Sequence, residues 1–247
     1  MGLRLDDLDG DARYDAWIRI VRRIYDEQVA QAWGHYMFRL LRAVFVTNQR
    51  LSEEGGFIFR WMVENYVDSA LMVLRRELDR QDGTENLRNL LFDMIDNPTV
   101  VSRARYLARW GLSPTDKAWH ANRVFDGFNP IRVANHPEAD HLDPASIRAD
   151  LDRVGASADH LREYAERTRA HRTPGRPGLD TTAMTFGALH EALVTVRDVI
   201  AKYYGVLTQA SLAQWEAVPQ FSTLQPFTRP WVEDRAAVER AIGEEPR

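Results

Sequence analysis

Apolar side chains recur every three or four residues along most of the chain, which is the spacing of one face of an α-helix. The period is most regular in two seams, at Ile147, Leu151, Val154, Ala158, Leu161, Ala165 and Thr168, and at Leu189, Leu193, Val196, Ile200, Tyr203 and Leu207. A Pro- and Gly-rich stretch at residues 173–178 follows the first helix. Two such seams with a short connection predict an antiparallel helical hairpin.

The N-terminal part of the chain predicts a second pair of long helices. Asp9 stands where a helix start favours an acidic cap, and the first helix is expected to kink or break at Gly34 before it continues towards Phe45. Residues 48–56 are interpreted as a connection, and the apolar period then predicts a long helix over residues 58–78.

Shorter helices are predicted between these two pairs. Thr84 is expected to cap a helix that runs to about residue 95, and Asn97-Pro98 to end it and start another one through Leu107. Ser113-Pro114 resembles a capped helix start and leads to about residue 128. Residues 129–142 are interpreted as a loop, after which the helix ending at His171 begins.

After Ser211 the pattern changes, because aromatic residues alternate with prolines. This segment predicts an extended arm whose rings cover the bundle or, alternatively, a second subunit; its residues are Trp215, Pro219, Phe221, Pro226, Phe227, Pro230 and Trp231. No segment shows the two-residue alternation of a strand. The sequence therefore predicts one all-α domain, an antiparallel helical bundle over residues 1–211 with additional short helices and an arm over residues 212–247.

The composition indicates in which cellular compartment the protein is expected and which kinds of partner it is expected to bind. The 247 residues include no cysteine, which excludes disulfides and cysteine-based zinc sites and favours the cytoplasm. No apolar run approaches the roughly 18 residues of a membrane span, and no secretory signal is evident, so no membrane association is expected. A net charge of -4 is not the overall footprint of a nucleic-acid-binding protein.

One stripe of side chains carries candidate chemistry. His160, Tyr164, Arg167 and His171 occupy relative positions 0, 4, 7 and 11, so they project from one face of a helix. Arg167 and His171 are about 6 Å apart along the axis, and His160 and His171 about 16 Å. An arginine can stabilise charge on a phosphoryl group and a histidine can move a proton, so this pair predicts phosphate chemistry without a cofactor.

Structural interpretations stand beside this one. His171 and Arg172 can satisfy carbonyl groups at a helix end, with Tyr164 and Arg167 lying against the neighbouring helix. The loop from His136 to His141 offers two imidazoles and two carboxylates, but its spacing matches no known metal-site pattern, and no metal is predicted. Three further histidines are expected to be buried and hydrogen-bonded rather than catalytic: His35, His120 and His190.

Residues 164–172, Tyr-Ala-Glu-Arg-Thr-Arg-Ala-His-Arg, resemble the Arg–His helix end of HEPN proteins, and more narrowly of their AbiU-like abortive-infection branch. Residues 74–79, 86–91 and 185–190 resemble that branch too, so the likeness extends over roughly residues 12–207. The family's active motif has four to six residues between Arg and His, whereas three separate Arg167 from His171 in this chain.

The resemblance implies a helical bundle that forms a homodimer through its motif helices. It also implies a metal-independent endoribonuclease in which the RNA 2′-hydroxyl attacks its own phosphate, and a role in toxin or phage-defence systems with a cognate antitoxin or defence partner. Arg167 and His171 are then the catalytic pair, and the substrate contacts are His160, Tyr164, Arg169 and Arg172. Two alternatives remain open: a catalytically inactive binding or interaction protein, and a structural dimer with no site.

Overall fold

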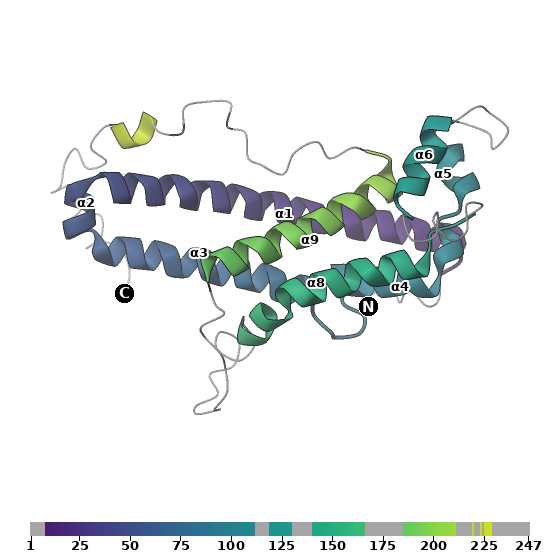
Figure 1. The fold of residues 1–247 in the computed structure, drawn as a ribbon, viewed down its shortest axis with the longest axis horizontal. Helices are drawn as coiled ribbons and strands as arrows, with labels where there is room; N and C mark the ends of the chain where they lie inside the picture. Colours follow the sequence, from purple (N-terminus) through teal and green to yellow (C-terminus); the bar gives the residue numbers. More distant parts are fainter. Residues whose placement is uncertain are drawn as a thin grey trace, which may run out of the picture.

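The computed structural model describes residues 8–111, 119–129, 140–165, 185–210, 219, 223 and 225–228. All regular secondary structure in these ranges is helical, so the prediction of an all-α helical bundle is confirmed (Figure 1). Two pairs of long helices form the body of the bundle, and the short helices α5 and α6 lie at one end of it (Figure 1).

The first pair is an antiparallel hairpin of α1 (Gly10–Thr47) and α3 (Gly56–Glu77). Asp9 caps α1, as the sequence predicted, because its carboxylate accepts hydrogen bonds from the N–H groups of Asp11 and Ala12. A short helix, α2 (Gln49–Glu54), turns the chain between the two long helices (Figure 1).

The expected break at Gly34 is wrong, because α1 passes through this residue as one helix. Residues 48–56 connect the two long helices, as predicted, and most of the connection is itself helical. A glycine inside a helix costs only about 1 kcal/mol relative to alanine, and burial of Ala32 and Phe38 on either side of it outweighs that cost. The Asn48 side chain starts α2 by accepting a hydrogen bond from the N–H of Leu51.

The cap of α4 (Leu87–Asp96) lies two residues later in the chain than predicted. Its cap is Asn86, whose side-chain oxygen accepts from the N–H of Asn89 at 2.8 Å. The Thr84 hydroxyl, the predicted cap, instead donates to the carbonyl of Gln81 and accepts from the Asn86 side-chain amide. Thr84 therefore orients the cap without being the cap.

Three short helices follow α4: η2 (Pro98–Val100), α5 (Arg103–Arg109) and α6 (Trp119–Gly127). Pro98 opens η2 rather than α5, which starts only after Ser102 has capped it with its hydroxyl. The predicted start of α6 at Ser113-Pro114 lies outside the described residues.

The second pair, α8 (Pro144–Ala165) and α9 (Phe186–Thr208), is antiparallel, as the two seams predicted. Asp150, near the start of α8, accepts hydrogen bonds from Lys202 Nζ at 2.5 Å and from the Tyr203 hydroxyl at 2.9 Å, near the end of α9. Every described seam position is buried except Leu151, which is half-buried. The predicted extension of this helix from residue 166 to His171 lies outside the described residues.

The core lies where the two pairs meet, because α9 packs on α1, α3 and α8. Its largest fully buried side chains include Trp17, Phe125 and Tyr203. The Tyr14 hydroxyl donates to the carbonyl of Leu207 at 2.9 Å, which fixes the start of α1 against the end of α9. The helices α1 and α9 are therefore antiparallel.

The α1–α3 hairpin extends beyond the start of α9 and the end of α8 (Figure 1). At this end the exposed apolar residues Val46, Phe57, Ile58 and Trp61 form what we call the hairpin-end patch. Phe57 is 81% exposed and Trp61 58% exposed, which is unusual for side chains of this size.

Little of the predicted C-terminal arm belongs to the described residues. The short helix η5 (Gln225–Thr228) is described, and the hydroxyl of Thr223 shares a hydrogen bond of 2.6 Å with that of Tyr36 on α1. Three of the aromatic residues assigned to the arm, Trp215, Phe221 and Trp231, lie outside the described residues. No helix in the described part of the chain has both the length and the apolar character of a membrane span.

Candidate functional site

The predicted catalytic stripe begins on α8, and the structure describes its first two residues. His160 and Tyr164 belong to α8, whereas four predicted site residues lie outside the described residues: Arg167, Arg169, His171 and Arg172. The juxtaposition of Arg167 and His171 therefore stays a prediction.

The last turns of α8 have one buried face and one open face. Ala158, Leu161 and Ala165 are fully buried, whereas His160 is exposed. Tyr164 is half-buried and packs against the hydrophobic core, as the structural alternative predicted for it. Of the two described stripe residues, His160 is thus the more accessible to a ligand.

Charges near this end of α8 are partly neutralised by ion pairs. The Arg162 guanidinium donates to the Asp159 carboxylate at 3.2 Å, and Asp159 also lies 3.6 Å from the Arg80 guanidinium. Asp159 is half-exposed, so these pairs contribute no more than about 1 kcal/mol each. Only the Arg80–Asp159 pair joins α8 to the segment that follows α3, because Arg162 and Asp159 both belong to α8.

The isolated histidines differ from the prediction. His120 and His190 are exposed, so the expectation that they are buried is wrong, whereas His35 is half-buried and its Nδ1 lies 2.7 Å from the Tyr66 hydroxyl. The ring of His141 donates from Nδ1 to the carbonyl of Leu142, and residues 130–139 of the predicted polar loop lie outside the described residues. Within the described ranges no three potential metal ligands come together.

A cluster of polar side chains that the sequence did not predict lies between α1, α3 and α9. We call it the Arg197 cluster, and its members are Gln28, Gln31 and His35 on α1, Tyr66 on α3, and His190 and Arg197 on α9. Arg197 is only 6% exposed, Gln28 0% and Gln31 5%, which is rare for side chains of these types.

The antiparallel register of α1 and α9 arranges the Arg197 cluster in two levels. The rings of His35 and His190 stack with centroids 4.9 Å apart. Seven residues along each helix from this contact lead to Gln28 on α1 and Arg197 on α9. These two residues are therefore level with each other, about 10 Å further along the helix axes. We call the level of His35 and His190 the outer level, and it opens to solvent at His190. The level of Gln28 and Arg197 is the inner level, and it is buried.

Polar atoms of the inner level lack partners among the described residues. These atoms are Nε and Nη2 of Arg197, Nε2 and Oε1 of Gln28, and Nε2 of Gln31, all of which are buried. The Gln31 Oε1 atom accepts a hydrogen bond from the Ser69 hydroxyl at 3.3 Å. Buried polar groups are normally hydrogen-bonded, so this concentration of unpartnered donors is the strongest anomaly in the described core.

The electrostatics of the Arg197 cluster are those of a positive site. Burial and, to a smaller extent, the charges of His190, Arg197 and Arg39 together lower the pKa of His35 from 6.5 to about 4. Burial also raises the pKa of Tyr66, against an opposing effect of Arg197. His35 is therefore neutral at pH 7, and its neutrality is partly a consequence of uncompensated positive charge around it.

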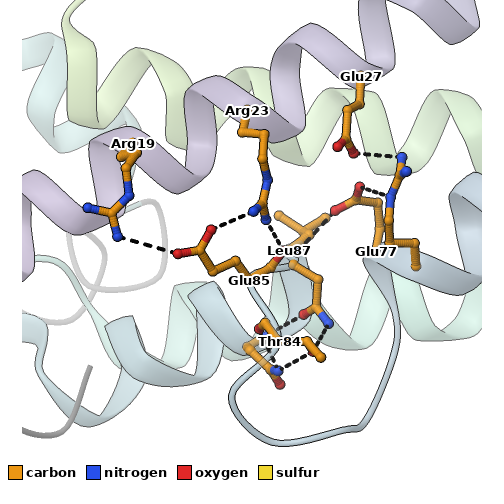
Figure 2. Close-up of polar contacts among 10 residues, drawn as sticks. Arg19, Arg23, Glu27, Glu77, Thr84, Glu85 and Leu87 are labelled. Atoms are coloured by element: carbon orange, nitrogen blue, oxygen red, sulfur yellow. Dashed lines mark hydrogen bonds and ion pairs between the residues drawn. The ribbon is translucent and has the colours of Figure 1, made fainter. Parts of the chain in front are cut away.

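A second buried ionisable side chain lies where α3 meets α4. Glu77 is 1% exposed, and its carboxylate accepts a hydrogen bond of 3.2 Å from the N–H of Leu87, the first residue of α4 (Figure 2). Burial raises the pKa of Glu77 to about 7, although the Leu87 N–H and the Arg76 guanidinium oppose the increase. This hydrogen bond joins the end of α3 to the start of α4 inside the core.

The same connection is fixed to α1 by Glu85. Its carboxylate lies between the guanidinium groups of Arg19 and Arg23, at 3.3 and 2.5 Å (Figure 2). Beside them an open groove of about 540 Å³ is lined by Asp15, Ile18, Arg19, Arg22, Arg23, Asp26 and Arg109. Its four guanidinium groups face three carboxylates when Glu85 is included, so the groove is nearly neutral and is a poor anion site.

Comparison of the chain with protein-family models, with curated protein sequences and with solved structures gives no match. The interpretation of its function therefore depends on the residues themselves.

Proposed function

We propose that this chain is a HEPN-like protein that acts on RNA as a metal-independent endoribonuclease in phage defence or a related toxin system. The observation that supports the proposal best is the antiparallel pair of α8 and α9, with His160 exposed on the last turns of α8. The predicted catalytic segment follows Ala165 directly. On a helix that continues past Ala165, a nucleotide chain bound at His160 would extend towards Arg167 and His171.

The proposed chemistry uses only groups of the chain and of the RNA. His171 removes the proton of a ribose 2′-hydroxyl, whose oxygen attacks the adjacent phosphorus, and the bond from phosphorus to the 5′-oxygen breaks. The leaving 5′-oxygen takes up a proton from water, and His171 returns to water the proton that it removed, so the products are a 2′,3′-cyclic phosphate and a 5′-hydroxyl end. Arg167 stabilises the negative charge that grows on the phosphoryl oxygens.

Substrate contacts are assigned along the same helix face. His160 is about 16 Å from His171 along a continuous helix, which corresponds to a contact with a neighbouring nucleotide rather than with the reacting phosphate. Tyr164 offers the exposed part of its ring for stacking on a base. Arg169 and Arg172 add positive charge for the phosphate backbone.

Cleavage of a labelled single-stranded RNA in the presence of EDTA tests this proposal. We expect His171→Ala and Arg167→Ala to abolish cleavage while helical circular dichroism stays unchanged. His120→Ala is the matched control, because this exposed histidine lies on α6, far along the chain from the predicted segment. If wild type and His171→Ala cleave equally, the activity is a contaminant and the endoribonuclease is refuted.

The alternative is a non-catalytic interaction protein, and the hairpin-end patch is the observation that favours it. Four exposed apolar side chains at one end of a helical hairpin are typical of a surface that contacts another chain, either a second copy or a cognate antitoxin or defence partner. Light scattering after gel filtration of wild type and Trp61→Glu tests the homodimer. We expect a dimer mass for wild type and a monomer mass for Trp61→Glu. Trp119→Glu, on α6, is the control and should keep the mass of wild type. Equal masses for wild type and Trp61→Glu would exclude the patch as the dimer contact.

A further inference from the structure

The Arg197 cluster holds a buried cation that no described side chain neutralises. Arg197 lies at a buried position of α9, and no carboxylate is among the groups that influence its pKa, which burial lowers and Tyr66 raises. An arginine stays protonated at neutral pH even when it is buried. The folded chain thus keeps one full positive charge in its core without a described counter-charge, which is unfavourable unless something else compensates it.

The identity of the unpartnered atoms indicates what would compensate the charge. Nε and Nη2 lie on one edge of the guanidinium and point in parallel, which is the geometry that binds two oxygen atoms of one oxyanion. The buried side-chain amide of Gln28 offers further N–H donors at the same level, and that of Gln31 does so about one helical turn away. Water can satisfy the amides, but it brings no negative charge to the guanidinium.

We infer that the inner level of the Arg197 cluster is a binding site for a small oxyanion, a phosphate group or a carboxylate, that is held by the Nε–Nη2 edge of Arg197 with the amides of Gln28 and Gln31. The site goes beyond the proposed ribonuclease, because none of its residues belongs to the predicted stripe of α8. Its occupancy adds negative charge close to His35 and Tyr66, and it removes the imbalance that the unliganded chain carries in its core.

Thermal unfolding of the full chain with added oxyanion tests the site. Sodium phosphate in one arm and sodium acetate in the other are titrated at constant ionic strength, kept with sodium chloride. We expect a saturable rise of the melting temperature with at least one of the two anions, and the arm that responds identifies the class. The rise should be absent in Arg197→Met and retained in Arg39→Met, a control that removes an exposed charge from the same region of α1.

Two results overturn the inference. Phosphate stabilises many proteins by exclusion from their surface, so an equal rise in wild type and Arg197→Met means that no site exists. No saturable rise in wild type with either anion means that the core charge is compensated in another way. In both cases the cluster is structural.

Titration of His35 by NMR gives a second measurement that needs no Arg197 variant. The imidazole signal is assigned with His35→Gln, and we expect its midpoint to lie near pH 4 without oxyanion. Saturation with the responding anion should raise the midpoint by at least about half a unit, because a bound negative charge offsets the positive charges that depress it. An unchanged midpoint would contradict binding at this position, whatever the melting temperatures show.

Discussion

Replacing Glu77 by Gln removes a buried charge and keeps the shape of the side chain. The amide oxygen of Gln can still accept the hydrogen bond of 3.2 Å from the N–H of Leu87. Any difference between the two proteins that varies with pH therefore reports the ionisation of Glu77 and not the loss of the contact with α4. This separation makes the substitution a sharp test of how the core treats a carboxyl group.

The pKa of Glu77 sets the sign of the effect. Its pKa is about 7 in the folded chain and 4.5 in the unfolded chain, so the folded state holds the proton more tightly. The stabilising contribution is fully present below pH 4.5 and is lost as the pH rises through 7. One unit of pKa shift corresponds to about 1.4 kcal/mol, so the difference between the folded and unfolded pKa of Glu77 corresponds to about 3 kcal/mol of stability. About 2 to 3 kcal/mol of this stability is lost between pH 5 and pH 8.

Urea unfolding followed by circular dichroism at several pH values measures this effect. We expect the free energy of unfolding of Glu77→Gln, relative to wild type, to increase by about 2 to 3 kcal/mol from pH 5 to pH 8. Glu85→Gln is the control, because it removes a partly exposed carboxylate from the same connection. We expect its relative free energy to vary by less than about 1 kcal/mol. A constant difference between Glu77→Gln and wild type across this range would refute the reasoning.

Two further substitutions test other parts of the structure by the same urea unfolding. Arg197→Met should raise the free energy of unfolding by about 1 to 4 kcal/mol in a buffer without oxyanions, because it replaces an uncompensated buried charge with an apolar side chain. A decrease in the free energy of unfolding would show that Arg197 has a stabilising partner. Asn86→Ala should lower the free energy of unfolding by about 1 kcal/mol, because it removes the cap of α4. Thr84→Ala should lower it by less. Equal decreases for the two substitutions would contradict the assignment of Asn86 as the cap.

The long helices could be predicted from the sequence because their signals are local and repeated. Six seam positions from Leu189 to Leu207 all lie on one face of α9, and all six are buried. The Asp9 cap is equally local, since it needs only the N–H groups of the next three residues. The antiparallel pairing of α8 and α9 follows from two adjacent seams and a short connection.

Single residues that act through tertiary context were predicted less well. Gly34 suggested a break by its intrinsic propensity, but the packing of α1 against α3 and α9 keeps the helix continuous. Thr84 and Asn86 are both acceptable caps on local grounds. Asn86 takes the position because its amide also reaches the carbonyl of Asp79, a contact that depends on how the chain returns from α3.

The two candidate sites differ in what the sequence could show. The stripe from His160 to His171 is visible as a helical spacing, but its catalytic pair lies outside the described residues and stays a prediction. The Arg197 cluster is assembled from three helices, so no single segment displays it. The one local signal is Arg197 itself, which directly follows the seam residue Val196 and lies four residues after another, Leu193.

Glu77 and Arg197 show two different ways in which this fold contains a buried ionisable group. The Glu77 carboxyl has a backbone donor and can become neutral near pH 7, so the chain by itself limits the cost of burying it. Arg197 can neither lose its proton near neutral pH nor find an acceptor among the described residues. Stability alone therefore does not account for Arg197, since an apolar side chain would serve the core better. A buried guanidinium edge whose two donors have no acceptor among the described residues is better explained by a ligand than by packing.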